Sequence, residues 1–362
     1  LGLLTMKYCS VVPKNVVEFY DDDFRSNPIG TGPFKFKRWE ENIKLVLRKN
    51  ENYFQKDSIG NQLPYLEAVS ITFLPEKQSE FLQLVKGKID FISGLDNSYK
   101  DEIITTDGRL NESYKDRVKM LRGPYLNTEY LAFFLKSEKN EIKSELIRKA
   151  INIGFDKRKM LKFLRNGVGI PAEAGFIPSG LPGYKKNNIN KYNTELAKSY
   201  VNNYKEKYNS TPSLTLTTSS NYLDLCEFIQ KELEKLGIEI NIDVIPGSAL
   251  KQAKANGKLD FFRASWIADY PDAENYLSLF YSKNLAPDGP NYTHFSNDEY
   301  DRMYENSLRE TNPEKSKLLY QKMDSIITSK SIIVPLFYDE VVRFISKNAV
   351  SYTHLRAHET LE

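Results

Sequence analysis

Few residues in this chain have the types and spacing that catalysis or metal binding requires. The sequence of 362 residues contains three histidines, and His354 and His358 lie close to its C-terminus. His294 is then the only other histidine, which is too few for a His-based metal site or a Ser-His-Asp triad. The motifs GxSxG, HExxH and GxxxxGK(S/T) do not occur. We therefore expect no enzymatic activity and neither a metal nor another cofactor.

The acidic clusters and the two cysteines indicate structural roles. The acidic residues at positions 21–23 and 40–41 lie in polar, turn-like sequence, where solvated charge is the expected state. Cys9 and Cys226 are far apart, and no CxxC motif is present. A buried free thiol at Cys226 is the simpler interpretation, and a disulfide between the two cysteines is the alternative.

One short segment combines a cation, aromatic rings and a carboxylate. Residues 261–272 contain Arg263, Trp266, Asp269 and Tyr270. An arginine in a strand favours an inter-strand ion pair, a tryptophan suits a core as well as a cleft, and an aspartate before Tyr-Pro is typical of a turn. Tyr270 carries little weight, because the chain has 23 tyrosines. The residues alone therefore favour structural roles over ligand contact.

Length and composition favour a globular protein of about two domains. Hydrophobic residues make up 40% and charged residues 27% of the chain, as in ordinary water-soluble proteins. The formal net charge is only +3, and lysines alternate with acidic residues, so we expect no nucleic-acid partner. No apolar run is long enough to span a bilayer.

Both ends of the sequence have unusual features. The chain starts at Leu1 without a methionine or an apolar leader, so we expect that a signal segment is absent from it. Residues 351–362 have no helix or strand periodicity and resemble translated sequencing-adaptor sequence with a cloning scar. We expect a non-native tail there and leave it out of the functional reasoning.

Two segments share a strand–helix–strand pattern and nearly the same residues. Elements at 69–86 precede Gly-Lys-Ile-Asp-Phe at 87–91, and elements at 238–256 precede Gly-Lys-Leu-Asp-Phe at 257–261. In each, the glycine fits a left-handed helix C-cap and the Asp-Phe step enters a strand. We therefore predict two βαβ units in equivalent places of two lobes, each in its own sheet.

The remaining elements follow from hydrophobic periodicity and caps. Alternating segments at 32–39 and 43–48 predict a β-hairpin. The other predicted elements are helices at 143–154, 156–165 with Asp156 as N-cap, 221–236, 297–310 and 313–330, a loop at 167–184, and a last strand at 336–345.

Five stretches form an ordered set along the chain. They are PIGTGPFKFKRW (28–39), RKNENY (48–53), GKID (87–90), RKAINIGFD (148–156) and FRASWIADYPD (262–272). This set resembles the oligopeptide- and dipeptide-binding proteins of ABC importers, the extracytoplasmic solute-binding proteins of family 5. The resemblance covers essentially residues 1–350. It implies an α/β, two-lobed periplasmic-binding-protein type II fold, here partial, with mixed sheets flanked by helices.

The resemblance also implies a domain map. Residues 1–131 would belong to lobe I, residues 132–336 would form the second lobe, and residues 337–350 would be a strand that returns to lobe I. Family members carry a further N-terminal portion that supplies part of the lobe I sheet and one wall of the pocket. This chain is therefore expected to contain only part of that pocket.

A ligand site is implied at the end of the strand that contains Arg263. In the similar proteins an aspartate three residues after a tryptophan binds the ligand ammonium, which implies that role for Asp269, with Trp266 beside it. The other implied ligand-binding residues are Ser265, Ile267 and Ala268 through their backbone groups, Arg263 through the ligand carboxylate, and Tyr270 as pocket lining.

The implied function is capture of peptides in an interlobe cleft and delivery to an ABC permease in the membrane. We expect a monomer outside the cytoplasm, in the periplasm or as a membrane-anchored lipoprotein. A ligand-loaded sensor and a carbohydrate-active enzyme are the alternatives. Nickel chelates, haem and oligosaccharides are alternative ligands, since the family includes proteins that carry them.

The tail at 351–362 gives a first testable expectation. Because these residues have no burial pattern, deleting them should leave the melting temperature unchanged. Thermal unfolding of the shortened and the complete chain measures this. A large drop in melting temperature would show that the tail belongs to the native structure.

Overall fold

The chain folds into two compact units. The computed structural model describes residues 2–74, 78–94, 99–187 and 189–349, so the tail predicted at 351–362 lies outside the described residues. Unit 1 comprises Leu1–Ile103, Leu110–Leu121 and Val342–Glu362, and unit 2 comprises Ile104–Arg109 and Arg122–Val341. The lobe boundaries expected near residues 131 and 336 stay a prediction.

Unit 1 contains a three-stranded antiparallel sheet and short helices. Its elements are α1 (Lys14–Tyr20), β1 (Phe34–Glu40), β2 (Lys44–Lys49), β3 (Ala68–Thr72), α2 (Gln78–Val85), β4 (Phe91–Ser93), α3 (Lys100–Ile103) and the ends of β5 and β10. Strands β1 and β2 form the predicted hairpin, with Asn42 at a positive φ of 58° in its turn. The register shifts between Phe36 and Arg38, so Lys37 is an extra, bulged residue.

Unit 2 is built on the larger sheet. Its strands are β5 (Val118–Phe133), β6 (Ile170–Pro171), β7 (Ser213–Thr218), β8 (Glu239–Val244), β9 (Phe261–Ile267) and β10 (Ile333–Ser346). Its helices are α4 (Asn140–Lys143), α5 (Glu145–Ile153), α6 (Lys157–Arg165), α7 (Thr194–Tyr208), α8 (Leu223–Glu234), α9 (Gly247–Ala255), α10 (Glu274–Leu277), α11 (Asp298–Ser307) and α12 (Pro313–Ser329). The seven-stranded sheet runs in the order β4-β10-β5-β9-β7-β8, and β6 pairs with β10.

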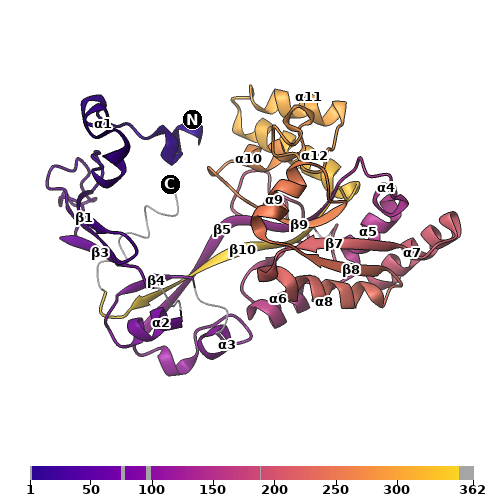
Figure 1. Ribbon diagram of the computed structural model, residues 1–362, viewed down its shortest axis with the longest axis horizontal. Helices are drawn as coiled ribbons and strands as arrows, with labels where there is room; N and C mark the ends of the chain where they lie inside the picture. The colour runs from indigo at the N-terminus through magenta and orange to yellow at the C-terminus, as the bar shows by residue number, and fades with distance from the viewer. Residues whose placement is uncertain (1, 75–77, 95–98, 188, 350–362) are drawn as a thin grey trace. The chain divides into compact units, whose positions relative to one another are not determined.

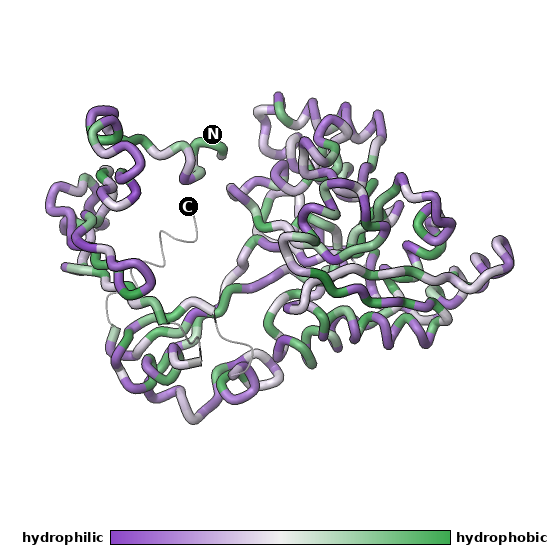
Figure 2. The backbone as a smooth tube through the Cα atoms, viewed as in Figure 1, coloured by the Kyte–Doolittle hydropathy of each residue, from purple (hydrophilic) through white to green (hydrophobic). Residues whose placement is uncertain are grey.

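The sheet of unit 2 separates two hydrophobic cores. Strand alternation places Leu131 and Phe261 on the face that packs with α5 to α8, and Tyr130 and Phe262 on the face that packs with α10 to α12. Figure 1 shows α6 and α8 on one side of the strands and α10 to α12 on the other. Hydrophilic and hydrophobic residues alternate along the helices in Figure 2, which fits helices with one buried face.

Several predicted helix boundaries are confirmed by capping contacts. The Asp156 side chain accepts hydrogen bonds from the amides of Arg158 and Lys159 at the start of α6. Asn312 caps α12 in the same way, with Pro313 in the first turn. Among the described helices, none is both long and apolar enough to cross a membrane.

The Gly-Lys-(Ile/Leu)-Asp-Phe repeat is confirmed locally, but the arrangement predicted from it is wrong. Gly87 and Gly257 both end a helix at positive φ, 70° and 62°. Helix α9 does connect two strands, β8 and β9, that run parallel to β7. However, β3 pairs with β2 in the small sheet while β4 pairs with β10, so the first segment is no βαβ unit.

The prediction of one sheet per repeat is also wrong, because β4 and β9 belong to the same hydrogen-bonded sheet. The physical reason is the length of β5 and β10, which each take part in both units. Similar sequences around a helix C-cap predict similar local backbone geometry. They do not predict which strand the following strand will pair with. The two cysteines are both free, and the predicted burial of Cys226 is confirmed.

A buried aspartate on α12 holds the loop predicted at 167–184. The Oδ1 atom of Asp324 accepts a hydrogen bond from the amide of Phe176 at 2.7 Å, and the amide of Ile177 also donates to this carboxyl. A β-carbon on Gly175 would lie 1.8 Å from Asp324 Oδ2, so only glycine permits this approach. Burial raises the pKa of Asp324 to about 7.

This raised pKa predicts a pH-dependent stability. Between pH 4 and 7 the folded state keeps the proton on Asp324 while the unfolded state loses it, so stability falls as pH rises, by at most about 1.4 kcal/mol per pH unit for one group. Urea unfolding of an Asp324→Asn variant should show a shallower fall over this range. Equal pH dependence of the variant and the parent would contradict the assignment.

Candidate functional site

The predicted site residues lie on and just after β9, and the pairing of β9 with β5 decides what they can contact. The register places Ser265 opposite Glu129 and Ile267 opposite Asn127. Side chains of Arg263, Ser265 and Ile267 therefore share one face of the sheet, and Trp266 lies on the other. The predicted site residues therefore lie close together at the end of β9, but their side chains are divided between the two faces of the sheet.

Arg263 forms the inter-strand ion pair that its position in a strand favoured. One guanidinium nitrogen contacts Glu129 Oε2, and both side chains are almost completely buried. The guanidinium carbon also lies 3.2 Å from the centroid of the Tyr222 ring. Burial raises the pKa of the Glu129 carboxyl, while Arg263 and Asn127 act against that rise. Arg263 is therefore held by the protein itself.

The turn after β9 is organised by Asn275, a residue that the sequence analysis did not single out. Its Oδ1 atom accepts hydrogen bonds from Trp266 Nε1 at 2.8 Å and from the amide of Asp269 at 3.1 Å. Trp266 is partly buried and packs against the core that includes Tyr276. One buried amide oxygen thus fixes both the indole and the backbone of Asp269.

The carboxylate of Asp269 is exposed after this turn. Within the described parts of the chain, its carboxylate has no ion-pair or hydrogen-bond partner. Tyr270 instead points to Glu274, to which its hydroxyl donates a hydrogen bond. Burial and the bond to Glu274 raise the pKa of Tyr270. Asp269 is therefore the available anion of the predicted set.

Among the described residues, the later part of β9 has no neighbouring strand on one side because β7 is short. Strand β7 pairs with β9 only at Phe261 and Phe262 in the described structure. The amide of Ala268 donates to the carbonyl of Leu126 at 2.9 Å, which assigns the even-numbered residues of β9 to the β5 side. By alternation, the amides and carbonyls of Ser265 and Ile267 point to the side that β7 leaves open.

No role was predicted for Glu129 or Asn127 from the sequence. Glu129 is a charged residue that follows the polar residues Asn127 and Thr128 and directly precedes the apolar stretch 130–135. A lone acid entering an apolar strand signals a buried partner, since an unpaired buried charge is costly. Among the described residues, no three His, Cys, Asp or Glu side chains gather closely enough to hold a metal ion.

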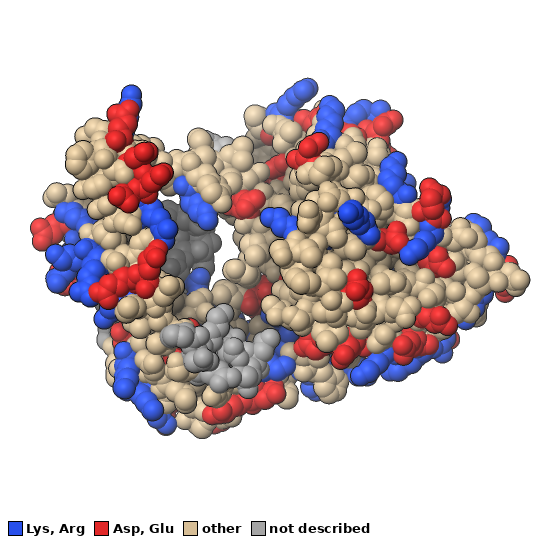
Figure 3. Space-filling view, viewed as in Figure 1, with Lys and Arg blue, Asp and Glu red and all other residues tan. Residues whose placement is uncertain are grey.

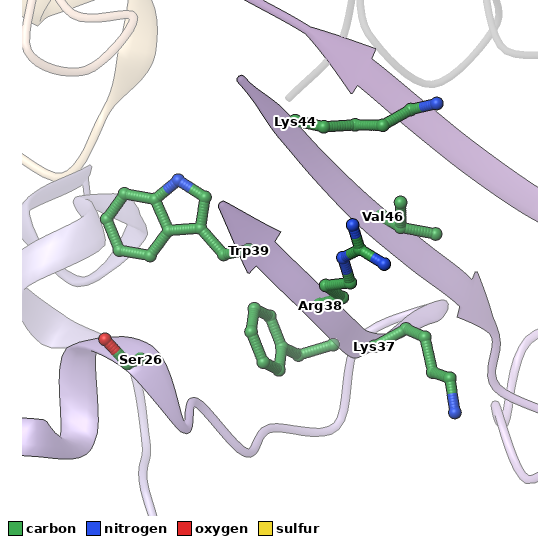
Figure 4. Close-up of a pocket in the computed structure, with 7 residues that line it drawn as sticks. Ser26, Lys37, Arg38, Trp39, Lys44 and Val46 are labelled. Atoms are coloured by element: carbon green, nitrogen blue, oxygen red, sulfur yellow. The ribbon is translucent and has the colours of Figure 1, made fainter. Parts of the chain in front are cut away.

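A separate pocket lies in unit 1 and contains none of the predicted site residues. Figure 4 shows Lys37, Arg38 and Trp39 of β1 beside Lys44 and Val46 of β2. The guanidinium carbon of Arg25 lies over the Trp39 ring, 4.7 Å from its centroid. On the face of unit 2 shown in Figure 3, acidic and basic side chains are intermixed, which fits the nearly balanced charge of the sequence.

Comparison with known proteins now decides the family. The model of "Bacterial extracellular solute-binding proteins, family 5 Middle" matches residues 2–288. The chain belongs to this family. The resemblance and the α/β binding-protein fold predicted from the sequence are thereby confirmed.

Curated relatives of this chain share only about a quarter of its residues. The Probable D,D-dipeptide-binding periplasmic protein DdpA of Escherichia coli (strain K12) is 26% identical over 337 residues, which are 90% of this chain and 60% of the relative. The oligopeptide-binding protein AppA of Bacillus subtilis (strain 168) is 25% identical, with 87% of this chain and 59% of the relative covered. The chain thus spans about three-fifths of the length of these relatives.

A solved structure confirms the fold at low identity. The periplasmic binding protein DppA of Helicobacter pylori, solved with the peptide STSA, superposes with a TM-score of 0.72 and is 24% identical. The match covers 95% of this chain and 65% of that structure. At this identity the likeness concerns the arrangement of strands and helices, not the ligand.

The buried pair predicts an asymmetry in mutational cost. Removing one partner strands a buried charge, so Arg263→Met and Glu129→Leu should each destabilise the protein by about 3 to 5 kcal/mol, while the double variant should recover most of that loss. Urea unfolding measures this. As a control, Lys149→Met breaks an exposed helical pair with Glu145 and should cost less than about 1 kcal/mol.

If Arg263→Met costs no more than Lys149→Met, the pair with Glu129 is not formed in the folded protein. A double variant no more stable than its worse single variant would show that the two side chains act independently.

Proposed function

We propose that this chain is the part of an extracytoplasmic solute-binding protein that captures peptides and passes them to an ABC permease, without turnover. Family membership and the peptide-binding relatives support this proposal. The observation that carries it is the open edge of β9, where Ser265 and Ile267 offer backbone groups directly before the exposed carboxylate of Asp269.

This arrangement matches the fixed features of a peptide. An extended peptide can add to a free strand edge through its own amides and carbonyls, so recognition does not depend on its side chains. A ligand that runs antiparallel to β9 brings its N-terminus toward Asp269, whose charge complements an ammonium. Asn275 holds the Asp269 backbone in place before the ligand arrives, which lowers the ordering cost of binding.

The proposal includes further statements that follow the family. The protein acts outside the cytoplasm, in the periplasm or anchored to the membrane as a lipoprotein, and it binds as a monomer. Trp266 lies beside the bound ammonium, and Tyr270 lines the pocket through its ring. Ala268 contributes less than expected, because its amide already bonds to Leu126.

Asp269→Asn tests the proposal. Loss of the charge pair should weaken peptide binding by about two to three orders of magnitude, and N-acetylated peptides should bind the parent protein just as weakly. Calorimetric titration with tetra-alanine and its acetylated form measures both effects. Recovery of intact peptide after long incubation checks that nothing is hydrolysed.

A matched control separates local from general effects. Asp243 on β8 is also an exposed aspartate at the end of a strand, and Asp243→Asn should leave binding unchanged. If Asp269→Asn binds normally, or if the parent accepts free and acetylated peptides alike, Asp269 is only a turn residue.

A further inference from the structure

Glu274, at the start of α10, is held at both carboxylate oxygens by tyrosine hydroxyls. Tyr270 donates to Oε2 from the turn after β9, and Tyr304 donates to Oε1 from α11. Burial, and then the bond to Glu274, raises the pKa of Tyr304, so its hydroxyl remains a donor. The Tyr304 ring is buried, and its centroid lies 4.6 Å from that of the Tyr281 ring. Glu274 therefore ties the turn after β9 to a well-packed part of α11.

The turn after β9 is also closed by hydrogen bonds of its own. Asp272 Oδ1 accepts from the amide of Glu274 at 2.9 Å, and the amide of Asp272 donates to the carbonyl of Tyr270 at 2.8 Å. The amide of Asp269 is bound in the same turn by Asn275. Because these contacts link the turn into one unit, a displacement of Glu274 is passed on to the backbone of Asp269.

Tyrosine differs from lysine and arginine as a partner for an acid. A neutral hydroxyl fixes a carboxylate without cancelling its charge, whereas a cation would do both. Among the described residues, neither Asp272 nor Glu274 forms an ion pair. The turn that presents Asp269 therefore keeps a negative potential, and that potential favours a cationic group of a ligand over a neutral one.

We propose that Glu274 is a positioning residue of the ligand site, which fixes the turn through Tyr304 so that the Asp269 carboxylate meets the ligand ammonium. This inference rests on the proposed function. Glu274 acts through Asp269, because each of its own oxygens already accepts a hydrogen bond from a tyrosine. Its contribution is confined to the part of the affinity that depends on the ammonium, so a ligand without that charge gains nothing from it.

An exposed carboxylate needs such a support in order to bind tightly. Asp269 is exposed, and a loose turn would have to be ordered each time that a ligand binds, which weakens binding. A turn that is fixed beforehand avoids this ordering cost. One hydrogen bond to a charged group is worth about tenfold in an equilibrium constant, which sets the size of the effect to expect from the loss of one tyrosine hydroxyl.

The test compares the parent protein with Tyr304→Phe by calorimetric titration of tetra-alanine and N-acetyl-tetra-alanine. Removal of the hydroxyl loosens the turn, so the affinity for the free peptide should fall about tenfold while that for the acetylated peptide stays unchanged. Glu274→Gln keeps the size of the side chain but offers one acceptor oxygen in place of two, and it should show the same selective loss. On an Asp269→Asn background, Tyr304→Phe should cause no further loss.

Tyr300→Phe is the matched control, because it also removes a buried hydroxyl bond from α11. Tyr300 donates to the carbonyl of Leu277 at 2.7 Å and not to an acid of the turn. This variant should keep the full preference for the free peptide. Melting temperatures verify that all variants are folded, and Glu274→Gln decides the matter if Tyr304→Phe does not fold.

The two peptides make the failure modes distinct. Equal losses for both peptides in Tyr304→Phe would show a merely structural role and overturn the proposal for Glu274. No loss for either peptide, while Asp269→Asn abolishes the preference, would overturn it as well and leave peptide binding standing. A parent that binds free and acetylated peptides alike, or binds neither, would instead overturn the proposed function and this inference with it.

Discussion

The antiparallel pairing of β5 with β9 is the constraint on which unit 2 depends. Its register places Tyr130 and Phe262 against one core and Leu131 and Phe261 against the other. A shift of one residue would exchange the two faces and bury the wrong side chains throughout the sheet. The same register brings Glu129 within reach of Arg263, so the polar end of the strand pair depends on the hydrophobic middle.

Burying an ion pair in this position has a specific consequence. The pair adds little net stability, since desolvation of two charges offsets most of their attraction. It does, however, fix the guanidinium of Arg263 against Tyr222 and remove it from competition for a ligand. Arg263 is therefore a structural residue of the β5–β9 pair.

Much of the local structure could be predicted from the sequence. The β1–β2 hairpin, the Asp156 and Asn312 caps and the left-handed glycines 87 and 257 all rest on interactions within a few residues. The pairing of distant strands could not be predicted in this way. Strands β4 and β9 follow nearly identical sequences, yet one pairs with β10 and the other with β5 and β7.

The site shows the same limit. The ligand-binding roles that the resemblance implies for Asp269 and Trp266 stay a prediction, and the inter-strand ion pair expected for Arg263 is confirmed. Asn275 was missed because its role is to accept two hydrogen bonds from residues six and nine positions earlier. Such a contact depends on the turn between them, which composition does not specify. Glu129 was missed because its partner lies 134 positions away.

Unit 1 poses a different physical problem. Among residues 2–74 only Asn50 and Pro64 are buried, while Phe19, Phe54 and Ile59 are each more than 70% exposed. A three-stranded sheet of this size needs a hydrophobic face covered by other structure to be stable. Relatives of this chain are longer than it by a wide margin. The described residues of this region therefore do not supply a core of their own.

The open edge of β9 illustrates why the proposed peptide site requires few particular side chains. Backbone groups become available there only because β7 turns away after Thr218, while β9 continues to Ile267. Exposing these backbone groups requires no particular side chain, so no sequence motif indicates the open edge. The exposed carboxylate of Asp269 follows directly after the strand. An extended peptide would pair with the exposed strand edge through its own amides and carbonyls, which is why the proposed site would accept peptides of different sequence.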